Sequence, residues 1–205
     1  AGTGNALFHL GGGIDVLNTS EKKAAALGVF VSPGAVGLYV GTLWGGGTVM
    51  STLLPPLGLL LLAGGILLLC RRTMGSFCSG NAPVETALAG GGWLALVPLF
   101  LVVVLRSWMG LGQSFPWKNQ WGVVLVIALA LGKAAGGFLM DAIGPRRAAG
   151  WSLGLAAVLY CFSGDPLPGL LAVFFFNMTM PMTLWAAARI LPGAKGFGFG
   201  LLTFA

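Results

Sequence analysis

Long apolar runs separated by short polar stretches are the dominant pattern along the chain. A helix needs roughly 20 apolar residues to cross the hydrocarbon core of a bilayer, and several of the runs approach or exceed that length. The runs are apolar throughout and do not alternate with period two, so lipid-facing barrel strands are not expected. The pattern predicts six complete or nearly complete helical spans and two truncated ones, at residues 1–17, 24–43, 48–70, 87–112, 120–140, 148–163, 167–187 and 196–205.

The composition supports a membrane environment. The chain is 57% hydrophobic and only 8% charged, whereas a soluble domain carries about 25% charged residues. Its mean hydropathy is +0.92. Because a soluble protein of this length needs a charged exterior that these residues cannot build, we expect an all-α, polytopic transmembrane helix bundle.

The basic residues predict which connections face the cytoplasm. Eight of them lie in four alternate connections, whereas the intervening connections 44–47, 113–119 and 164–166 hold only Lys118. Under the positive-inside rule, the connections rich in lysine and arginine are cytoplasmic. These connections are residues 18–23, 71–86, 141–149 and 188–195.

Charge and cysteine usage limit the partners that the chain can have. The net charge of +6 comes from basic residues spread over the whole length, so no nucleic-acid-binding patch is expected. The three cysteines, Cys70, Cys78 and Cys161, lack zinc-like spacing and are interpreted as small apolar residues. We therefore expect membrane lipid around the chain, and no nucleic acid, metal or cofactor.

Both ends of the chain are interpreted as cut. The sequence starts at Ala1, without a basic stretch before its first apolar run, which is not the pattern of a signal peptide. It stops within the apolar run GFGFGLLTFA (196–205). We therefore expect an internal piece of a longer membrane protein.

Glycines and prolines within the spans predict closely packed and bent helices. Glycine allows two helix backbones to approach each other, and proline removes a helical hydrogen bond. The glycines at such positions are Gly28, Gly34, Gly37, Gly41, Gly132 and Gly136, and the prolines expected to kink a span are Pro33, Pro98 and Pro181.

The stretch GGFLMDAIGPRR, residues 136–147, gathers three of the few charged side chains between two apolar runs. An aspartate at the end of a helix can accept charge-assisted hydrogen bonds from another helix N-terminus or from a neighbouring arginine. Such a contact would act as a gating latch, present in one conformation and broken in the other. The alternative is an ordinary short loop with cytoplasmic arginines. The gating-loop candidates are Gly137, Asp141, Gly144, Arg146 and Arg147.

The spacing of these five residues resembles the loop signature of the major facilitator superfamily, where it joins the second and third helices of a six-helix half. The basic residue that the family places just after the aspartate is Ala142 here, which puts the charge network of the loop in doubt. The segments GNALFHLGGG (4–13) and RSWMGLGQSFPW (106–117) resemble bacterial exporters related to the fosmidomycin-resistance proteins. These likenesses favour export over uptake, and the inner membrane of a bacterium as the location.

The resemblance implies a register within a twelve-helix transporter. Residues 1–70 would be helices four to six of the N-terminal bundle, and residues 71–86 the cytoplasmic central linker. Residues 87–205 would be helix seven to the start of helix eleven. Helices one to three and the remaining C-terminal helices would then lie outside this chain and complete the transporter.

Polar residues within the spans are the candidates for a substrate and proton pathway. A charge at the bilayer centre costs about 2.5–3.5 kcal/mol and is usually functional or paired. Arg106 is expected to bind an anionic or hydrogen-bonding group of the substrate, or else to snorkel to the outer headgroups. Lys133 either faces the bundle, where it could exchange a proton, or reaches the cytoplasmic interface.

His9 is the best proton-coupling candidate, with hydrogen-bonded packing as the alternative. The polar residues of the tenth helix are expected to contact substrate, or to form interhelical hydrogen bonds only. The remaining pathway candidates are Asn5, Gln113, Asn177 and Thr183.

These observations predict a secondary transporter that moves a small molecule outward by alternating access, coupled to protons. It would catalyse no covalent reaction, because no nucleophile elbow, histidine cluster or phosphate loop is visible. The alternatives are a polytopic membrane enzyme, and a receptor or scaffold of similar fold that does not transport.

Overall fold

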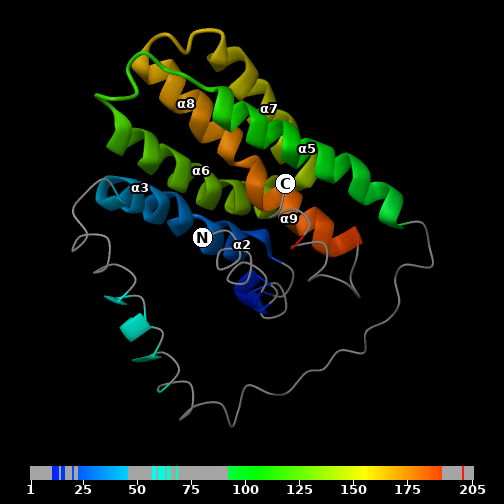
Figure 1. Cartoon of the computed structure of the whole chain (residues 1–205). Helices are drawn as coiled ribbons and strands as arrows, with labels where there is room; N and C mark the ends of the chain where they lie inside the picture. The colour runs from blue at the N-terminus through cyan, green and yellow to red at the C-terminus, as the bar shows by residue number, and fades with distance from the viewer. Residues whose placement is uncertain are drawn as a thin grey trace. The chain divides into compact units, whose positions relative to one another are not determined.

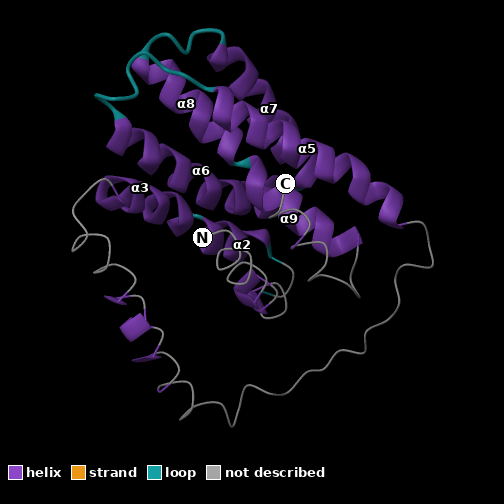
Figure 2. Ribbon diagram, in the orientation of Figure 1, coloured by secondary structure: helices purple, strands orange, loops and turns teal. Residues whose placement is uncertain are grey.

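The structure, a computed structural model, contains helices and no strand among the residues that it describes (Figures 1 and 2). The chain divides into two compact units, residues 1–36 with 84–205, and residues 37–83. The predicted domain limits of 1–70, 71–86 and 87–205 stay a prediction, because most of residues 46–91 lie outside the described part. The structure describes residues 11–13, 15–16, 20, 23–45, 57–58, 60–62, 64–65, 68, 92–190 and 200.

Seven helices contain most of the described residues. Among the described residues, three stretches are long and apolar enough to cross a membrane, at Ala24–Leu43, Gly122–Ile143 and Pro166–Ile190. The prediction of an all-helical, membrane-embedded protein is therefore supported, whereas six spans are not shown. The helices are α2 (Ala24–Val31), α3 (Pro33–Gly45), α5 (Gly92–Gly112), α6 (Gly122–Ile143), α7 (Pro145–Tyr160), α8 (Pro166–Asn177) and α9 (Thr179–Ile190).

Two of the three prolines expected to bend a span lie beside a helix break. The predicted span 24–43 is divided between α2 and α3 at Ser32, directly before Pro33. The predicted span 167–187 is divided between α8 and α9 at Met178, three residues before Pro181. A proline lacks the N–H that the carbonyl four residues earlier would accept, which weakens the helix on its N-terminal side. The third, Pro98, lies within α5, which continues through it.

The prediction of a loop at residues 141–149 is wrong. Helix α6 continues to Ile143 and α7 begins at Pro145, so a single residue, Gly144, connects them. Gly144 has a φ of 85°, a conformation that favours glycine. Proline is well suited to the first position of a helix, because its φ is preset and its missing N–H has no intrahelical partner there. Asp141 therefore lies in the last turn of α6, and the helix predicted at 148–163 starts earlier.

Helix packing in the larger unit depends on glycines of α6 and α2. A Cβ atom at Gly28 would lie 2.7 Å from the carbonyl oxygen of Lys133. A Cβ atom at Gly132 or Gly136 would collide with the backbone of the α8–α9 segment. The close approach predicted for these three glycines is confirmed. No described atom lies within 4 Å of a Cβ built at the other three predicted positions, Gly34, Gly37 and Gly41.

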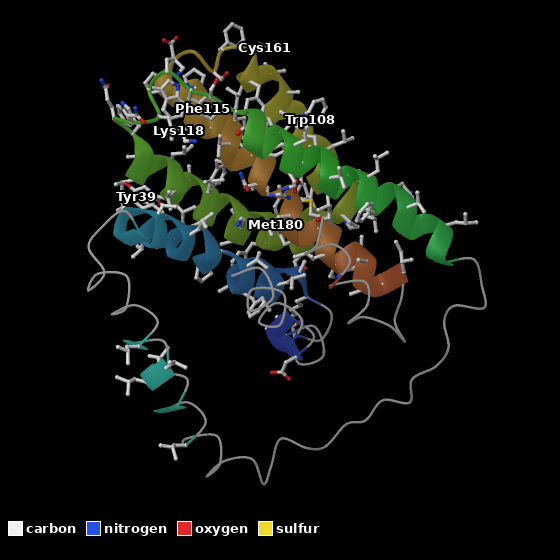
Figure 3. All side chains as sticks on the ribbon, in the orientation of Figure 1. Tyr39, Trp108, Phe115, Lys118, Cys161 and Met180 are labelled. Atoms are coloured by element: carbon white, nitrogen blue, oxygen red, sulfur yellow. The ribbon has the colours of Figure 1, made fainter. Side chains whose placement is uncertain are left out.

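Large apolar side chains cover outward-facing parts of the helices. Trp108 on α5, Leu131 on α6 and Trp151 on α7 are 71%, 56% and 65% exposed, and Trp108 projects from its helix in Figure 3. Extensive exposed apolar surface is uncommon on soluble monomers and is typical of membrane contact. The surface therefore agrees with embedding in lipid.

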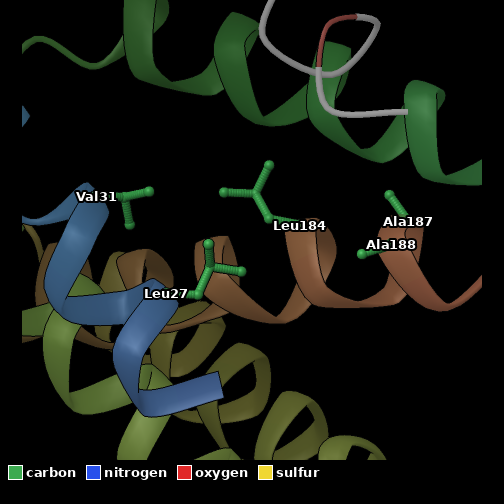
Figure 4. Close-up of a cluster of buried hydrophobic side chains, with 5 residues drawn as sticks. All are labelled: Leu27, Val31, Leu184, Ala187 and Ala188. Carbon is green, nitrogen blue, oxygen red and sulfur yellow. The ribbon is translucent and has the colours of Figure 1, made fainter. Parts of the chain in front are cut away.

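The interior of the larger unit contains small and branched apolar side chains. In Figure 4, Leu27 and Val31 of α2 face Leu184, Ala187 and Ala188 of α9. Helix α9 contacts α2, α5, α6, α7 and α8. A displacement of α9 would therefore be felt by each of these helices.

Candidate functional site

Arg106 donates hydrogen bonds to two residues of the α8–α9 segment. Its Nη2 lies 3.0 Å from Oδ1 of Asn177, and its Nη1 lies 3.2 Å from Oγ1 of Thr179. Its Cζ is 5.5 Å from the ring centroid of Phe176, within cation–π distance. The guanidinium therefore points toward the α8–α9 segment, while its expected binding of a substrate group stays a prediction.

Asn177 and Thr179 lie on opposite sides of the break at Met178. Asn177 ends α8, and its Nδ2 donates to the carbonyl of Val173 at 2.8 Å. Thr179 begins α9, and its Oγ1 donates to the carbonyl of Phe176 at 2.7 Å. Both side chains are buried. The guanidinium of Arg106 therefore joins the end of one helix to the start of the next.

Within the described residues, the partners of Arg106 are neutral. A guanidinium has five N–H donors, and two of them donate to Asn177 and Thr179. No described carboxylate forms a salt bridge with Arg106. A cation that is paired only with neutral groups inside an apolar bundle is suited to binding an anion.

Lys133 of α6 is the second cation predicted in the pathway. Its side chain is partly buried and has no hydrogen bond to any other described residue. Its orientation toward the bundle and its role in proton exchange stay predictions.

Tyr160, which the sequence analysis did not identify, extends the network toward Gln113. Nε2 of Gln113 donates to the Tyr160 hydroxyl at 2.6 Å. The Tyr160 ring meets Phe176 edge-on, with centroids 5.9 Å apart. No signal in the sequence identified Tyr160, although it is one of only two tyrosines in the chain.

Of the other predicted pathway residues, Thr183 is not joined to this network by any described contact. Thr183 donates to the carbonyl of Met180 within its own helix, at 2.9 Å. Asn5 and His9 lie outside the described residues.

Asp141 forms the second polar contact between distant segments. Its Oδ1 accepts a hydrogen bond from the backbone N–H of Ala24 at 2.8 Å, and its Oδ2 accepts one from Ala25 at 2.9 Å. These N–H groups belong to the first turn of α2 and have no intrahelical acceptor. The positive end of the helix dipole favours the carboxylate there. The contact expected between Asp141 and a helix N-terminus is therefore present.

Gly137 explains the spacing of the signature. It lies one turn before Asp141 on the same face of α6, and a Cβ atom there would collide with the Ala24 backbone. The absence of a side chain lets the start of α2 come close enough for both carboxylate oxygens to bind. Arg146 and Arg147 lie exposed in the first turn of α7 and form no ion pair with Asp141.

Two contacts bring together segments near connections that the sequence predicts on the same side of the membrane, while the side itself stays a prediction. The Asp141 contact joins segments next to two connections that the basic residues assign to the cytoplasm. At the other end of the helices, Nε1 of Trp117 donates to the Ser163 carbonyl at 3.0 Å, and its ring lies against Gly169. Both of these segments adjoin connections predicted to lie outside. The connections that meet are thus those predicted on the same side.

No protein-family model, curated protein or solved structure matches this chain. The likeness to the major facilitator superfamily therefore rests on the signature and local segments of the sequence. The geometry adds two separate polar contacts, at Arg106 and at Asp141, within a helical, membrane-embedded chain.

Proposed function

We propose that the chain belongs to a secondary transporter of the major facilitator type, which moves a small molecule by alternating access. The observation that carries the proposal is the Asp141 carboxylate at the N-terminus of α2. In the proposed register, α2 belongs to the N-terminal bundle and α6 to the C-terminal bundle. The contact then joins the two bundles at their cytoplasmic edge.

A contact between two moving bundles has to be both specific and breakable. The Asp141 contact is specific because two oxygens bind two adjacent N–H groups, which fixes the position of α2 along α6. It is breakable because Asp141 lies at an exposed helix end, where water can replace the lost hydrogen bonds. The cytoplasmic side would be closed while the contact holds and open when it breaks.

The substrate site of this transporter would lie around Arg106, with Lys133 adding positive charge. The Arg106 guanidinium, whose described partners are neutral, suits a small molecule that carries an anionic group. Export coupled to protons, through His9, in the inner membrane of a bacterium is the direction and location that the resemblance favours.

The test is transport by the complete gene product in proteoliposomes. Solid-supported-membrane currents are recorded for a panel of small carboxylates and phosphate monoesters, with and without a proton gradient. We expect a current for at least one compound, lost in Arg106→Ala and retained in Lys118→Ala. Lys118 is the matched control, since it is an exposed cation in a loop away from Arg106.

The other functional classes give different results in the same preparation. A receptor or scaffold would bind a compound without current in any gradient. A membrane enzyme would convert a compound, which mass spectrometry of the incubated panel detects. Either result would refute the transporter proposal.

A further inference from the structure

The break between α8 and α9 is held from two sides. On one side, Gly132 and Gly136 of α6 let the backbone of Phe174 and Met178 pack directly against α6. On the other side, the Arg106 guanidinium binds Asn177 before the break and Thr179 after it. The α6 contact is a fixed backbone fit, whereas the Arg106 contact consists of two side-chain hydrogen bonds. The second is the one that a ligand can exchange.

We propose that Arg106 is a clamp on the α8–α9 break and that an anionic group of the substrate opens it. This inference rests on the proposed transport function and specifies how its binding site acts. The present hydrogen bonds of the guanidinium go to neutral acceptors, whereas a carboxylate or phosphate adds its own charge and frequently binds two guanidinium nitrogens at once. An anion that binds Nη1 and Nη2 together would compete with the amide of Asn177 and the hydroxyl of Thr179 for the same N–H donors.

Release of the clamp leaves few polar groups unsatisfied. When Arg106 turns to an anion, the Asn177 amide still donates to the Val173 carbonyl, and the Thr179 hydroxyl still donates to the Phe176 carbonyl. Burying a polar group without any partner would be costly, but each of these side chains keeps one hydrogen bond. The exchange is therefore low in cost on the protein side.

The released segment has a defined route to the Asp141 contact. Leu184, Ala187 and Ala188 of α9 pack against Leu27 and Val31 of α2. The first turn of α2 is the part that Asp141 holds. A change of angle at Met178 would move α9 against α2. This movement would strain the hydrogen bonds between Asp141 and the first turn of α2. Arg106 would thus connect substrate binding to the opening of the cytoplasmic edge.

The test is hydrogen–deuterium exchange of the complete protein in lipid nanodiscs, read by mass spectrometry over peptides covering residues 176–184. Inorganic phosphate and acetate are the probes, and chloride at equal ionic strength is the control. We expect either probe to raise exchange in this segment about tenfold in the wild type, because release of the clamp allows the α8–α9 break to open locally and expose its backbone N–H groups. Peptides from α7 serve as the internal reference.

Variants distinguish a clamp that an anion opens from hydrogen bonds that only stabilise the fold. Arg106→Ala should show raised exchange without any anion and no further response to phosphate. Asn177→Ala and Thr179→Val each remove one competitor, so each should tighten phosphate binding about threefold to tenfold. If Arg106→Ala does not fold, the wild-type titration and these two variants still test whether Arg106 acts as a clamp. Lys118→Ala should behave as the wild type.

Two results would overturn the clamp. One is exchange in residues 176–184 that is the same in phosphate, acetate and chloride. The other is phosphate binding that weakens in both Asn177→Ala and Thr179→Val, because those side chains would then be ligands and not competitors. Transport is measured separately: currents with anion-independent exchange would refute the clamp alone, and anion-dependent exchange without currents would refute transport alone.

Discussion

Asp141 and Arg106 each connect segments far apart in the sequence, but they do so in opposite settings. Asp141 is an exposed anion at a helix end that binds backbone N–H groups. Arg106 is a partly buried cation that binds side-chain oxygens among apolar helices. Water can replace the partners of Asp141 but has less access to those of Arg106. The first contact suits a latch that opens freely, and the second suits a site that responds to a ligand.

Arg106→Ala gives the largest effect that this comparison predicts. The variant loses the two hydrogen bonds that the guanidinium would donate to the anionic group of the substrate. Each is worth about 1.5–3 kcal/mol, so we expect transport to fall by at least about a hundredfold. Initial currents in proteoliposomes measure it. Arg106→Lys keeps the charge but not the planar pair of donors, and it should recover part of the activity. Full activity in Arg106→Ala would remove Arg106 from the site.

Gly136→Ala tests whether the break depends on close backbone packing. The added methyl group would collide with the carbonyl of Met178, and overpacking of this kind costs about 1–3 kcal/mol. The thermal unfolding midpoint in detergent should fall. Gly150→Ala in α7 is the matched control: no described atom lies within 4 Å of its new Cβ, and alanine favours a helix interior. Equal midpoints for both variants would contradict the packing described.

The exposed contact was easier to predict from the sequence than the buried one. Asp141 stands in a spaced motif, and its binding to a helix N-terminus follows from elementary electrostatics. The role of Gly137 could not be predicted, because it depends on the start of α2, more than 100 residues away. The loop expected at 141–149 was too long, since Gly144 and Pro145 together allow an immediate restart of the helix.

The pairing of Arg106 with its partners could not be predicted from the sequence, because it depends on tertiary structure. Asn177 was predicted as a candidate, but its pairing with Arg106 requires α5 to pack on α9. Pro181 indicated a bend, yet the break lies at Met178, upstream of the proline, where the lost hydrogen bond acts. Tyr160 was missed because a tyrosine at the end of an apolar run is common in membrane helices and does not by itself indicate a site.

Asp141→Ala should have a smaller effect than Arg106→Ala. Both hydrogen bonds to α2 are lost, but the freed N–H groups gain water at the exposed helix end. We expect a change in transport of about tenfold or less, with Asp141→Asn intermediate because its amide oxygen still accepts one N–H. A cysteine introduced at Ala25 should become more reactive toward a membrane-impermeant thiol reagent in Asp141→Ala. An Asp141→Ala effect as large as that of Arg106→Ala would mean that the Asp141 contact is as shielded from water as the contacts of Arg106.

The smallest effects are expected for Arg146 and Arg147, although they belong to the same motif as Asp141. Both are exposed and form no ion pair with Asp141, so each alanine variant should change stability by only about 0.5 kcal/mol or less. Their charges would instead hold the α6–α7 turn on the cytoplasmic side. Arg147→Ala should therefore leave the reactivity of a cysteine at Ala25 unchanged, whereas Arg146→Glu combined with Arg147→Glu should alter the membrane orientation reported by fusions at this turn. If Arg147→Ala alone exposed residue 25 as strongly as Asp141→Ala does, the arginine would be part of the latch. The contact would then be a charge network and not a capped helix.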